Sequence, residues 1–231
     1  MRIFLNQFKK QITIPNVRPT PYDGLFIATT GEPATIRSGA DLLVSVDGET
    51  WQELPAGEEL VSNTIYLRKP EKVSFPDSSK RLTIESTERV YMEGDLSNYY
   101  DEDTGYGLSI YCSMVEDMSN VKVPALRHED TNLVRSINLK KSPVIVPIPN
   151  GSLAYSFFGC YNLREIDLRY LPEEYFLDAQ TTWITNVENE IVVKVNQNIS
   201  EKARYEMSWR AELKGSTLIF EDYEIDETNQ A

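Results

Sequence analysis

Hydrophobic and polar residues alternate in short runs over most of the chain, which is typical of β-strands with one buried face. Residues 42–46 show this alternation, and the Asp-Gly pair at 47–48 that follows them favours a tight hairpin. Further short runs lie at 65–68 and 82–84, each next to turn-forming residues. Several short strands separated by turns predict a small antiparallel β-sandwich over residues 23–88.

From residue 89 the alternating runs become shorter and the turns between them less regular. Asn-apolar pairs begin at Asn120, Asn132 and Asn162, and an ungapped alignment places Asn120 on Asn162. A repeated turn that leads into a short strand is typical of leucine-rich repeats. Because the steps between the three pairs are unequal, residues 89–220 are predicted to form a short, irregular repeat region. The predicted fold class is therefore mainly β, with an immunoglobulin-like sandwich followed by leucine-rich repeats.

The end of the repeat region combines two alternating runs with one helix. Residues 190–196 and 218–220 are expected to cap the open end of the repeats. Residues 201–213 lack Gly and Pro, and they predict a helix with Tyr205 and Trp209 on one face. Because large rings dominate small cores, we expect each tryptophan to anchor a hydrophobic core. These residues are Trp51, Trp183 and Trp209.

Residues 1–22 are predicted to form an extended arm. They include four basic residues and no acidic ones, and Ile12 and Ile14 alternate with a threonine ahead of three prolines. An extended segment of this kind can add a strand to a neighbour's sheet, or it can lie on its own domain. The residues expected to dock on another subunit are Arg2, Phe4, Phe8, Lys9, Lys10, Ile12, Ile14 and Arg18.

The charge distribution limits the class of partner. The net charge of −13 and the isoelectric point near 4.6 argue against general nucleic-acid binding. Residues 221–231 form an acidic tail with five acids and no Lys or Arg. The basic arm and the acidic tail can pair within one chain or between copies, or both can simply be solvated.

Nothing in the chain predicts a membrane segment or an export signal. No apolar run approaches the length of a membrane span. The first ten residues lack the continuous apolar stretch of a signal peptide. We therefore expect synthesis in the cytoplasm and no membrane partner.

Residue types that carry chemistry are sparse. His128, the one histidine, lies in a charged stretch without a nucleophile motif, and no phosphate loop or zinc spacing occurs. Cys112 and Cys160 are expected to be buried thiols. Residues 101–105 resemble the start of a calcium loop, but Cys112 stands where the final Glu is required, so an acidic turn is favoured over a weak cation site. The sequence predicts no catalytic, cofactor-binding or metal-binding residues.

Several tyrosines flank the acidic stretch 101–105. Rings beside carboxylates can pack along the flank of the repeats, form a protein interface or stack on the faces of sugars. A possible interface or glycan surface is therefore predicted, made of Tyr99, Tyr100, Asp101, Asp103, Tyr106 and Tyr111.

Residues 157–163, Phe-Phe-Gly-Cys-Tyr-Asn-Leu, resemble the Met-Phe-x-Gly-Cys-x-x-Leu core of BspA-like leucine-rich-repeat proteins. These proteins are frequent in gut Bacteroidetes and in their phages. Residues 45–51 are similar to the Ser-x-Asp-Gly-x-x-Trp hairpin of the β domain that often precedes such repeats, and 182–187 to their Trp-x-x-x-Val closing segment. Met118 instead of the first unit's Cys, and Asp95 instead of Asn, depart from the pattern. The resemblance implies adhesion or assembly and no catalysis.

A surface-protein architecture without an export signal predicts a virion component, which is made in the host cytoplasm and leaves with the particle. We expect a non-enzymatic bacteriophage structural protein, in a head decoration, head fibre or tail. Its expected partners are other virion subunits, in a homo- or hetero-oligomer. The alternative is a carbohydrate- or receptor-binding adhesin of the phage tail or bacterial surface. A hydrolase has only the lone histidine and scattered acids in its favour.

Overall fold

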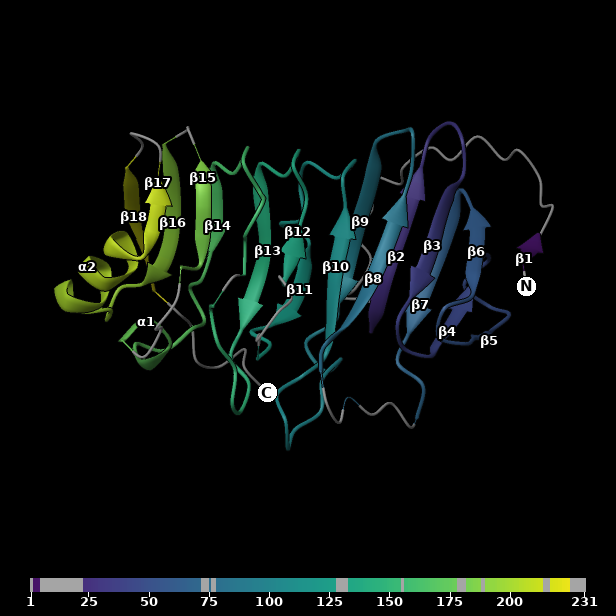
Figure 1. Ribbon diagram of the computed structural model, residues 1–231, viewed down its shortest axis with the longest axis horizontal. Helices are drawn as coiled ribbons and strands as arrows, with labels where there is room; N and C mark the ends of the chain where they lie inside the picture. The colour runs from purple at the N-terminus through teal and green to yellow at the C-terminus, as the bar shows by residue number, and fades with distance from the viewer. Residues whose placement is uncertain are drawn as a thin grey trace.

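The computed structural model describes residues 2–4, 23–71, 75, 78–127, 133–154, 156–177, 182–187, 190–213 and 217–224. This part of the chain contains eighteen strands and two short helices, so the predicted mainly-β class is confirmed. The strands stack side by side in two long sheets, in the manner of a β-solenoid (Figure 1).

The N-terminal half consists of antiparallel strands in two sheets that share one core. The first sheet contains, in spatial order, β5 (Gln52–Leu54), β4 (Leu42–Ser45), β7 (Thr64–Arg68), β2 (Gly24–Thr29) and β9 (Val90–Asp95). The second sheet contains β6 (Glu59–Ser62), β3 (Ala34–Ser38) and β8 (Lys80–Glu85). The runs predicted at 42–46, 65–68 and 82–84 all lie in these strands, and the predicted Asp-Gly turn joins β4 to β5.

The C-terminal half continues both sheets with parallel strands. The first sheet is extended by β11 (Val121–Pro124), β13 (Lys141–Val146), β14 (Glu165–Asp167), β16 (Ile191–Asn196) and β18 (Leu218–Tyr223). The second is extended by β10 (Leu108–Cys112) and β12 (Val134–Arg135), and a further pair consists of β15 (Ile184–Val187) and β17 (Ala211–Leu213). Residues 156–157 bridge these two groups, because the Val134 N–H donates to the Ser156 carbonyl at 3.0 Å and the Phe157 N–H to the Trp183 carbonyl at 3.0 Å.

The coils of this half have a regular length that the sequence did not show. Residues directly opposite each other on neighbouring strands of the first sheet are 22 to 27 positions apart, from Gly94 and Val121 to Lys194 and Glu221. This length lies within the range of leucine-rich repeats, about 20–29 residues. Each coil therefore contributes one strand to the first sheet, and the returning segment passes along the second.

The two halves are joined through shared strands. Strand β9 pairs antiparallel with β2 and parallel with β11, and β8 pairs antiparallel with β3 and parallel with β10. The buried apolar side chains of both halves belong to one cluster. The boundary predicted between 88 and 89 therefore separates two modes of strand pairing and not two separate cores.

Gly94 lies at this junction. Its φ of 137° is one that residues with a side chain rarely adopt, and a Cβ there would lie 2.0 Å from the Gly24 carbonyl oxygen. Only glycine lets β2 and β9 approach this closely.

The equivalent turn residues differ from those predicted. The side-chain amide of Asn162 donates to the Ile137 carbonyl at 2.6 Å, and that of Asn138 donates to the Ser113 carbonyl at 2.6 Å. Asn138 is therefore the partner of Asn162 in the preceding coil, and the alignment of Asn120 on Asn162 is wrong. Asn132 lies outside the described residues. The equivalent asparagines, Asn138 and Asn162, are 24 positions apart, which lies within the range of coil lengths, whereas Asn120 does not occupy the equivalent position.

Beside these turns lies a column of small buried side chains from successive coils, Cys112, Ser136 and Cys160. The Ser136 N–H donates to the Cys160 Sγ at 3.4 Å, and the Ser136 hydroxyl donates to the Val115 carbonyl at 3.0 Å. The prediction of two buried thiols is confirmed. Burial raises the pKa of Cys112 to about 11 and that of Cys160 to about 12.

The C-terminal end corrects two predictions. The helix predicted over 201–213 is shorter: α2 spans Glu201–Trp209, and residues 211–213 form β17. Strands β16 and β18 are further strands of the first sheet, so they do not form a separate cap, and β18 is the last strand of that sheet in the described chain. The other helix, α1, is a single turn at Glu174–Leu177.

The tryptophans differ in burial. Trp183 is 2% exposed, and its ring nitrogen donates to the Met207 carbonyl at 3.0 Å, as expected of a core anchor. Trp209 is 71% exposed, so the prediction that it anchors a core is wrong. The reason is that α2 buries Ala203 and Met207 and turns the face with Trp209 to solvent. Trp51 is partly exposed beneath the guanidinium of Arg68, 4.2 Å from the ring centre.

Candidate interaction surface

The acidic loop after β9 is held in shape by Asp101. One carboxylate oxygen of Asp101 accepts from the backbone N–H groups of Asp103 and Thr104, each at 3.1 Å. These bonds, that of Thr104 first, hold the pKa of Asp101 below its usual value. Asp101 therefore organises its own loop, which agrees with the predicted acidic turn.

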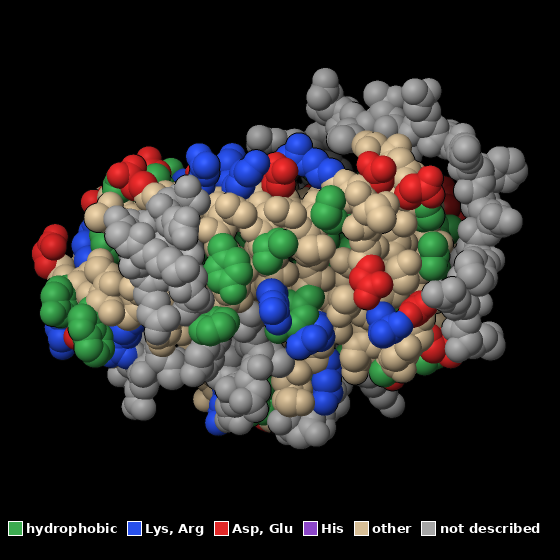
Figure 2. Space-filling model, turned by 45° about the horizontal axis from the view of Figure 1, so that its top comes forward, with side chains coloured by type: hydrophobic (Ala, Val, Ile, Leu, Met, Phe, Trp, Pro, Cys, Tyr) green, Lys and Arg blue, Asp and Glu red, His purple; other side chains and the backbone are tan. Residues whose placement is uncertain are grey.

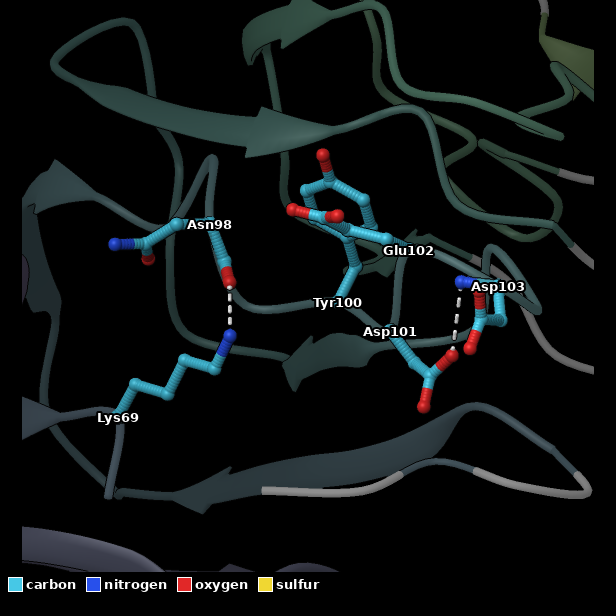
Figure 3. A pocket seen from close by; sticks show the side chains of 6 residues that line it. All are labelled: Lys69, Asn98, Tyr100, Asp101, Glu102 and Asp103. Carbon is cyan, nitrogen blue, oxygen red and sulfur yellow. Dashed lines mark hydrogen bonds between the residues drawn. The ribbon is translucent and has the colours of Figure 1, made fainter. Parts of the chain in front are cut away.

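An open cavity of about 310 Å³ lies beside this loop (Figure 3). Lys69 closes one side, and its ammonium group donates to the Asn98 carbonyl at 2.9 Å. Burial, and then the charge of Glu102, raise the pKa of Tyr100 above its usual value. The lining is polar and carboxylate-rich, and it consists of Lys69, Asn98, Tyr100, Asp101, Glu102 and Asp103.

The predicted tyrosine surface does not form one continuous site. Tyr100, Asp101 and Asp103 line the cavity together. Tyr99 and Tyr106 are buried in the core. Tyr111 is not part of the cavity lining, because it lies in β10 of the second sheet. The structure thus divides these residues among a cavity, the core and a second surface.

Tyr111 is the centre of that second surface. The guanidinium carbon of Arg81 lies 3.9 Å from the centre of the Tyr111 ring, and that of Arg135 lies 5.9 Å from it. The three residues come from β8, β10 and β12, which are successive parallel strands of the second sheet. Both cations are therefore placed by the backbone of the sheet and by stacking on one ring.

Large hydrophobic side chains are exposed in the adjoining coils. Phe158, Tyr161 and Ile137 are 40% to 49% exposed. Tyr161 and Ile137 occupy equivalent positions, each directly before the turn asparagine of its coil. Phe158 precedes Gly159, where a Cβ would lie 3.6 Å from the Arg135 side chain. We name the whole set the arginine–aromatic face: Arg81, Tyr111, Arg135, Ile137, Phe158 and Tyr161.

Hydrophobic and basic side chains lie side by side in the centre of the molecular surface shown in Figure 2. Several basic groups elsewhere are paired with carboxylates, as in Lys140–Glu116 at 2.9 Å and Lys194–Glu165 at 2.5 Å. Arg81 and Arg135 form no ion pair with any carboxylate that the structure describes. Exposed aromatic rings with unneutralised arginines have the composition of a protein interface.

Sequence reasoning found Tyr111 but missed the rest of this face. One signal was present: two large aromatic residues, Phe157 and Phe158, are adjacent directly before a glycine turn, where both are not expected to be buried together. Phe157 is buried and Phe158 is exposed. The two arginines gave no signal, because they are 54 positions apart in the sequence.

Only the start of the predicted docking arm is described. Strand β1 (Arg2–Phe4) lies parallel to β6 of its own chain, with Arg2 opposite Glu59. This pairing matches the alternative in which the arm lies on its own domain. The other predicted docking residues lie outside the described residues, as does His128; they are Phe8, Lys9, Lys10, Ile12, Ile14 and Arg18.

The described residues offer neither a metal-binding cluster nor a membrane-spanning helix. They contain no group of three or more His, Cys, Asp or Glu side chains placed to hold a metal ion. None of their helices has the length and apolar character needed to cross a membrane. In comparisons with known proteins, no family model, curated protein or solved structure matches the chain.

Proposed function

We propose that this chain is a non-enzymatic structural protein of a bacteriophage virion, in a head decoration, head fibre or tail, and that it acts through protein contacts. The arginine–aromatic face is the observation that carries the proposal. Arg and aromatic residues contribute most of the binding energy in protein interfaces. Here Arg81, Tyr111 and Arg135 lie on consecutive strands of one sheet, so little conformational entropy of their backbone is lost when a partner binds.

The proposed family supports this function. We propose that the N-terminal half is an immunoglobulin-like sandwich and the C-terminal half a BspA-like leucine-rich-repeat region. Coils of 22 to 27 residues, turn asparagines that bond to the preceding coil, and cysteines beside those turns all favour this assignment. Proteins of this type serve adhesion and assembly.

The basic arm remains part of the proposal. Its four basic residues and its Ile12-Thr13-Ile14 alternation suit docking on another subunit in the virion. Exposed ion pairs are each worth only about 0–1 kcal/mol, so backbone pairing and Phe side chains must supply most of the arm's affinity.

Particle incorporation tests the function. Mass spectrometry of purified particles, from a culture that expresses the gene, should detect the protein at structural stoichiometry. A chain with Arg81→Glu and Arg135→Glu should fold normally by circular dichroism and be lost from particles. Lys202→Glu, an exposed charge change on α2, is the control that should be retained. Particles that lack the wild-type protein, or that retain the double variant, would overturn the proposal.

The cavity beside the acidic loop favours a second candidate, a carbohydrate-binding adhesin. Its partly buried Tyr100 ring lies beside the carboxylate of Glu102, and Asp101 and Asp103 also line the cavity (Figure 3). A ring can stack on the face of a sugar while carboxylates accept from its hydroxyls. A glycan array should then show signals that Tyr100→Ala removes and that the arginine variants leave unchanged. An empty array, or signals that survive Tyr100→Ala, contradicts this reading.

A further inference from the structure

The arginine–aromatic face differs in charge from the molecule as a whole. The chain carries a net charge of −13, whereas this face presents two guanidinium groups without a described carboxylate partner. The partner that suits it best is therefore acidic, and a charge of opposite sign both guides the encounter and fixes the register.

The chain itself contains such a segment. Strand β18 ends at Tyr223, and the following residues include Glu224, Asp226 and Glu227 without any Lys or Arg. Within β18, the Asp222 carboxylate is already bonded to Arg204 of its own chain. Glu224 is exposed. Glu221, also in β18, accepts from the Tyr223 hydroxyl at 3.2 Å. The remaining acids of this end of the chain follow the strand.

We propose that residues 224–231 of a second copy occupy the arginine–aromatic face; this rests on the proposed assembly function. In an extended segment, side chains two positions apart lie on one side at about 6.8 Å. If the segment binds in an extended form, Glu224 and Asp226 of the second copy would present their carboxylates to the same side. Arg81 and Arg135 lie over the same ring, so two carboxylates with this spacing can each meet one guanidinium. Arginine receives a carboxylate through two parallel hydrogen bonds, which also selects orientation.

The position of β18 favours a second copy over the tail's own face. Strand β18 is the end strand of the first sheet, whereas Arg81, Tyr111 and Arg135 lie in the second sheet, on the other side of the core. The sheets of such a pair lie roughly 10 Å apart, and the tail would have to pass around this thickness as well as along several coils. A neighbouring copy has no such constraint. The resulting contact is head-to-tail, which gives closed rings or open chains.

Charge exchange tests the contact in the full-length protein. Sedimentation velocity over a micromolar to millimolar series should show self-association that weakens with salt. A face variant with Arg81→Glu and Arg135→Glu, and a tail variant with Glu224→Lys and Asp226→Lys, should each self-associate at least about tenfold more weakly. A mixture of the two should associate again, because the acidic face of one then meets the basic tail of the other. Lys202→Glu is the matched control and should behave as wild type.

Each other outcome decides against the inference. A wild-type protein that stays monomeric at millimolar concentration overturns it, as does a mixture that does not regain association. Association that is broken by Lys9→Glu with Lys10→Glu, and not by the face variant, assigns the tail to the basic arm instead. If the face variant is lost from particles while self-association never occurs, the proposed function stands and this inference fails.

Discussion

The two halves of this protein use the same two sheets but hold their strands by different means. In the antiparallel half, β4 and β5 are joined by a hairpin whose turn bonds within itself. Asp47 accepts from the N–H groups of Glu49 and Thr50 at 2.9 and 2.7 Å, and the Ser45 hydroxyl accepts from the Gly48 N–H at 2.9 Å. In the parallel half, each turn asparagine donates to a carbonyl of the preceding coil.

This difference predicts how far the destabilising effect of a substitution extends along the sheet. A hairpin that satisfies its own polar groups depends little on the next strand along the sheet. A coil whose turn bonds to its neighbour has the energetics of a stack, in which each unit depends on the adjacent one. Substitutions in the parallel half should therefore also destabilise neighbouring coils. Substitutions in the hairpin turn should affect only the strands that it joins.

The largest effect is expected at the junction of the halves, with Gly94→Ala. A Cβ there would lie 2.0 Å from the Gly24 carbonyl oxygen, so β2 and β9 must separate. We expect a loss of roughly 3 kcal/mol or more in the free energy of unfolding. Urea denaturation followed by circular dichroism should show one cooperative transition, because both halves share one core. The control Gly57→Ala is also at a positive φ, 85°, but no atom lies within 4 Å of its Cβ position, so it should lose only about 1–2 kcal/mol. Equal losses in both variants would contradict the argument.

The next effect compares two tryptophans of the parallel half. Trp183 is buried against Phe157, with ring centres 6.4 Å apart, and donates to the Met207 carbonyl. Trp183→Ala should therefore cost about 3–5 kcal/mol in unfolding free energy. Trp209→Ala removes an exposed ring and should stay within about 0.5 kcal/mol of wild type. The same urea titrations measure both, and a large loss with Trp209→Ala would show that α2 packs through its other face.

A smaller effect tests the dependence between coils. Asn162→Ala removes the bond to the Ile137 carbonyl and should cost about 1 kcal/mol. Asn138→Ala should cost a similar amount, through the bond to the Ser113 carbonyl. Because the two turns are stacked, we expect the double variant to differ from the sum of the single ones by at least about 0.5 kcal/mol. Strict additivity, measured by the same denaturation, would mean that these turns are independent after all.

The sequence allowed most of the antiparallel half to be predicted, because its signals are local. The Asp-Gly turn and alternation over five residues are enough to place β4, β7 and β8. Parallel pairing joins residues 22 to 27 positions apart and leaves no such local signal. For this reason the sequence pattern places the repeat on Asn120 instead of Asn138. It also predicts one helix over residues 201–213, because helix propensity does not show that residues 211–213 form β17.

The candidate surface was predictable to a smaller degree. Their spacing in the sequence suggested that Tyr99, Tyr100, Tyr106 and Tyr111 form one surface. In the structure the side chains of Tyr99 and Tyr106 are buried in the core. Arg81 and Arg135 meet on Tyr111 only because β8, β10 and β12 are stacked in parallel. A surface formed by residues of several coils depends on which residues face each other on neighbouring strands. The sequence did not reveal this strand register.

The smallest expected effect is the loss of stability at low pH. It compares one carboxylate from each half, Asp47 and Glu173. Hydrogen bonds from the backbone of Thr50, then of Glu49, hold the pKa of Asp47 well below its usual value. The side chain and then the N–H of Ser200 lower the pKa of Glu173 in the same way. A carboxyl whose folded pKa is depressed contributes stability above its unfolded pKa, about 3.9 for Asp and 4.3 for Glu, and loses it as the pH falls through the folded pKa.

Both carboxyls should therefore stabilise the protein at pH values of about 5 and above, and less as acid is added. We expect Asp47→Asn and Glu173→Gln to lower the urea midpoint slightly at about pH 5, with each difference from wild type shrinking toward about pH 2. The Glu173 difference should begin to shrink at the higher pH, because its unfolded pKa is higher. Asp47 accepts through one oxygen, which Asn retains, so its difference reports charge. Glu173 accepts through both oxygens, so Gln also loses one acceptor, and only the pH-dependent part of that difference reports charge. A difference that is constant over this pH range would show that the two carboxyls act only as neutral acceptors, and that the turns of the two halves do not depend on their charge.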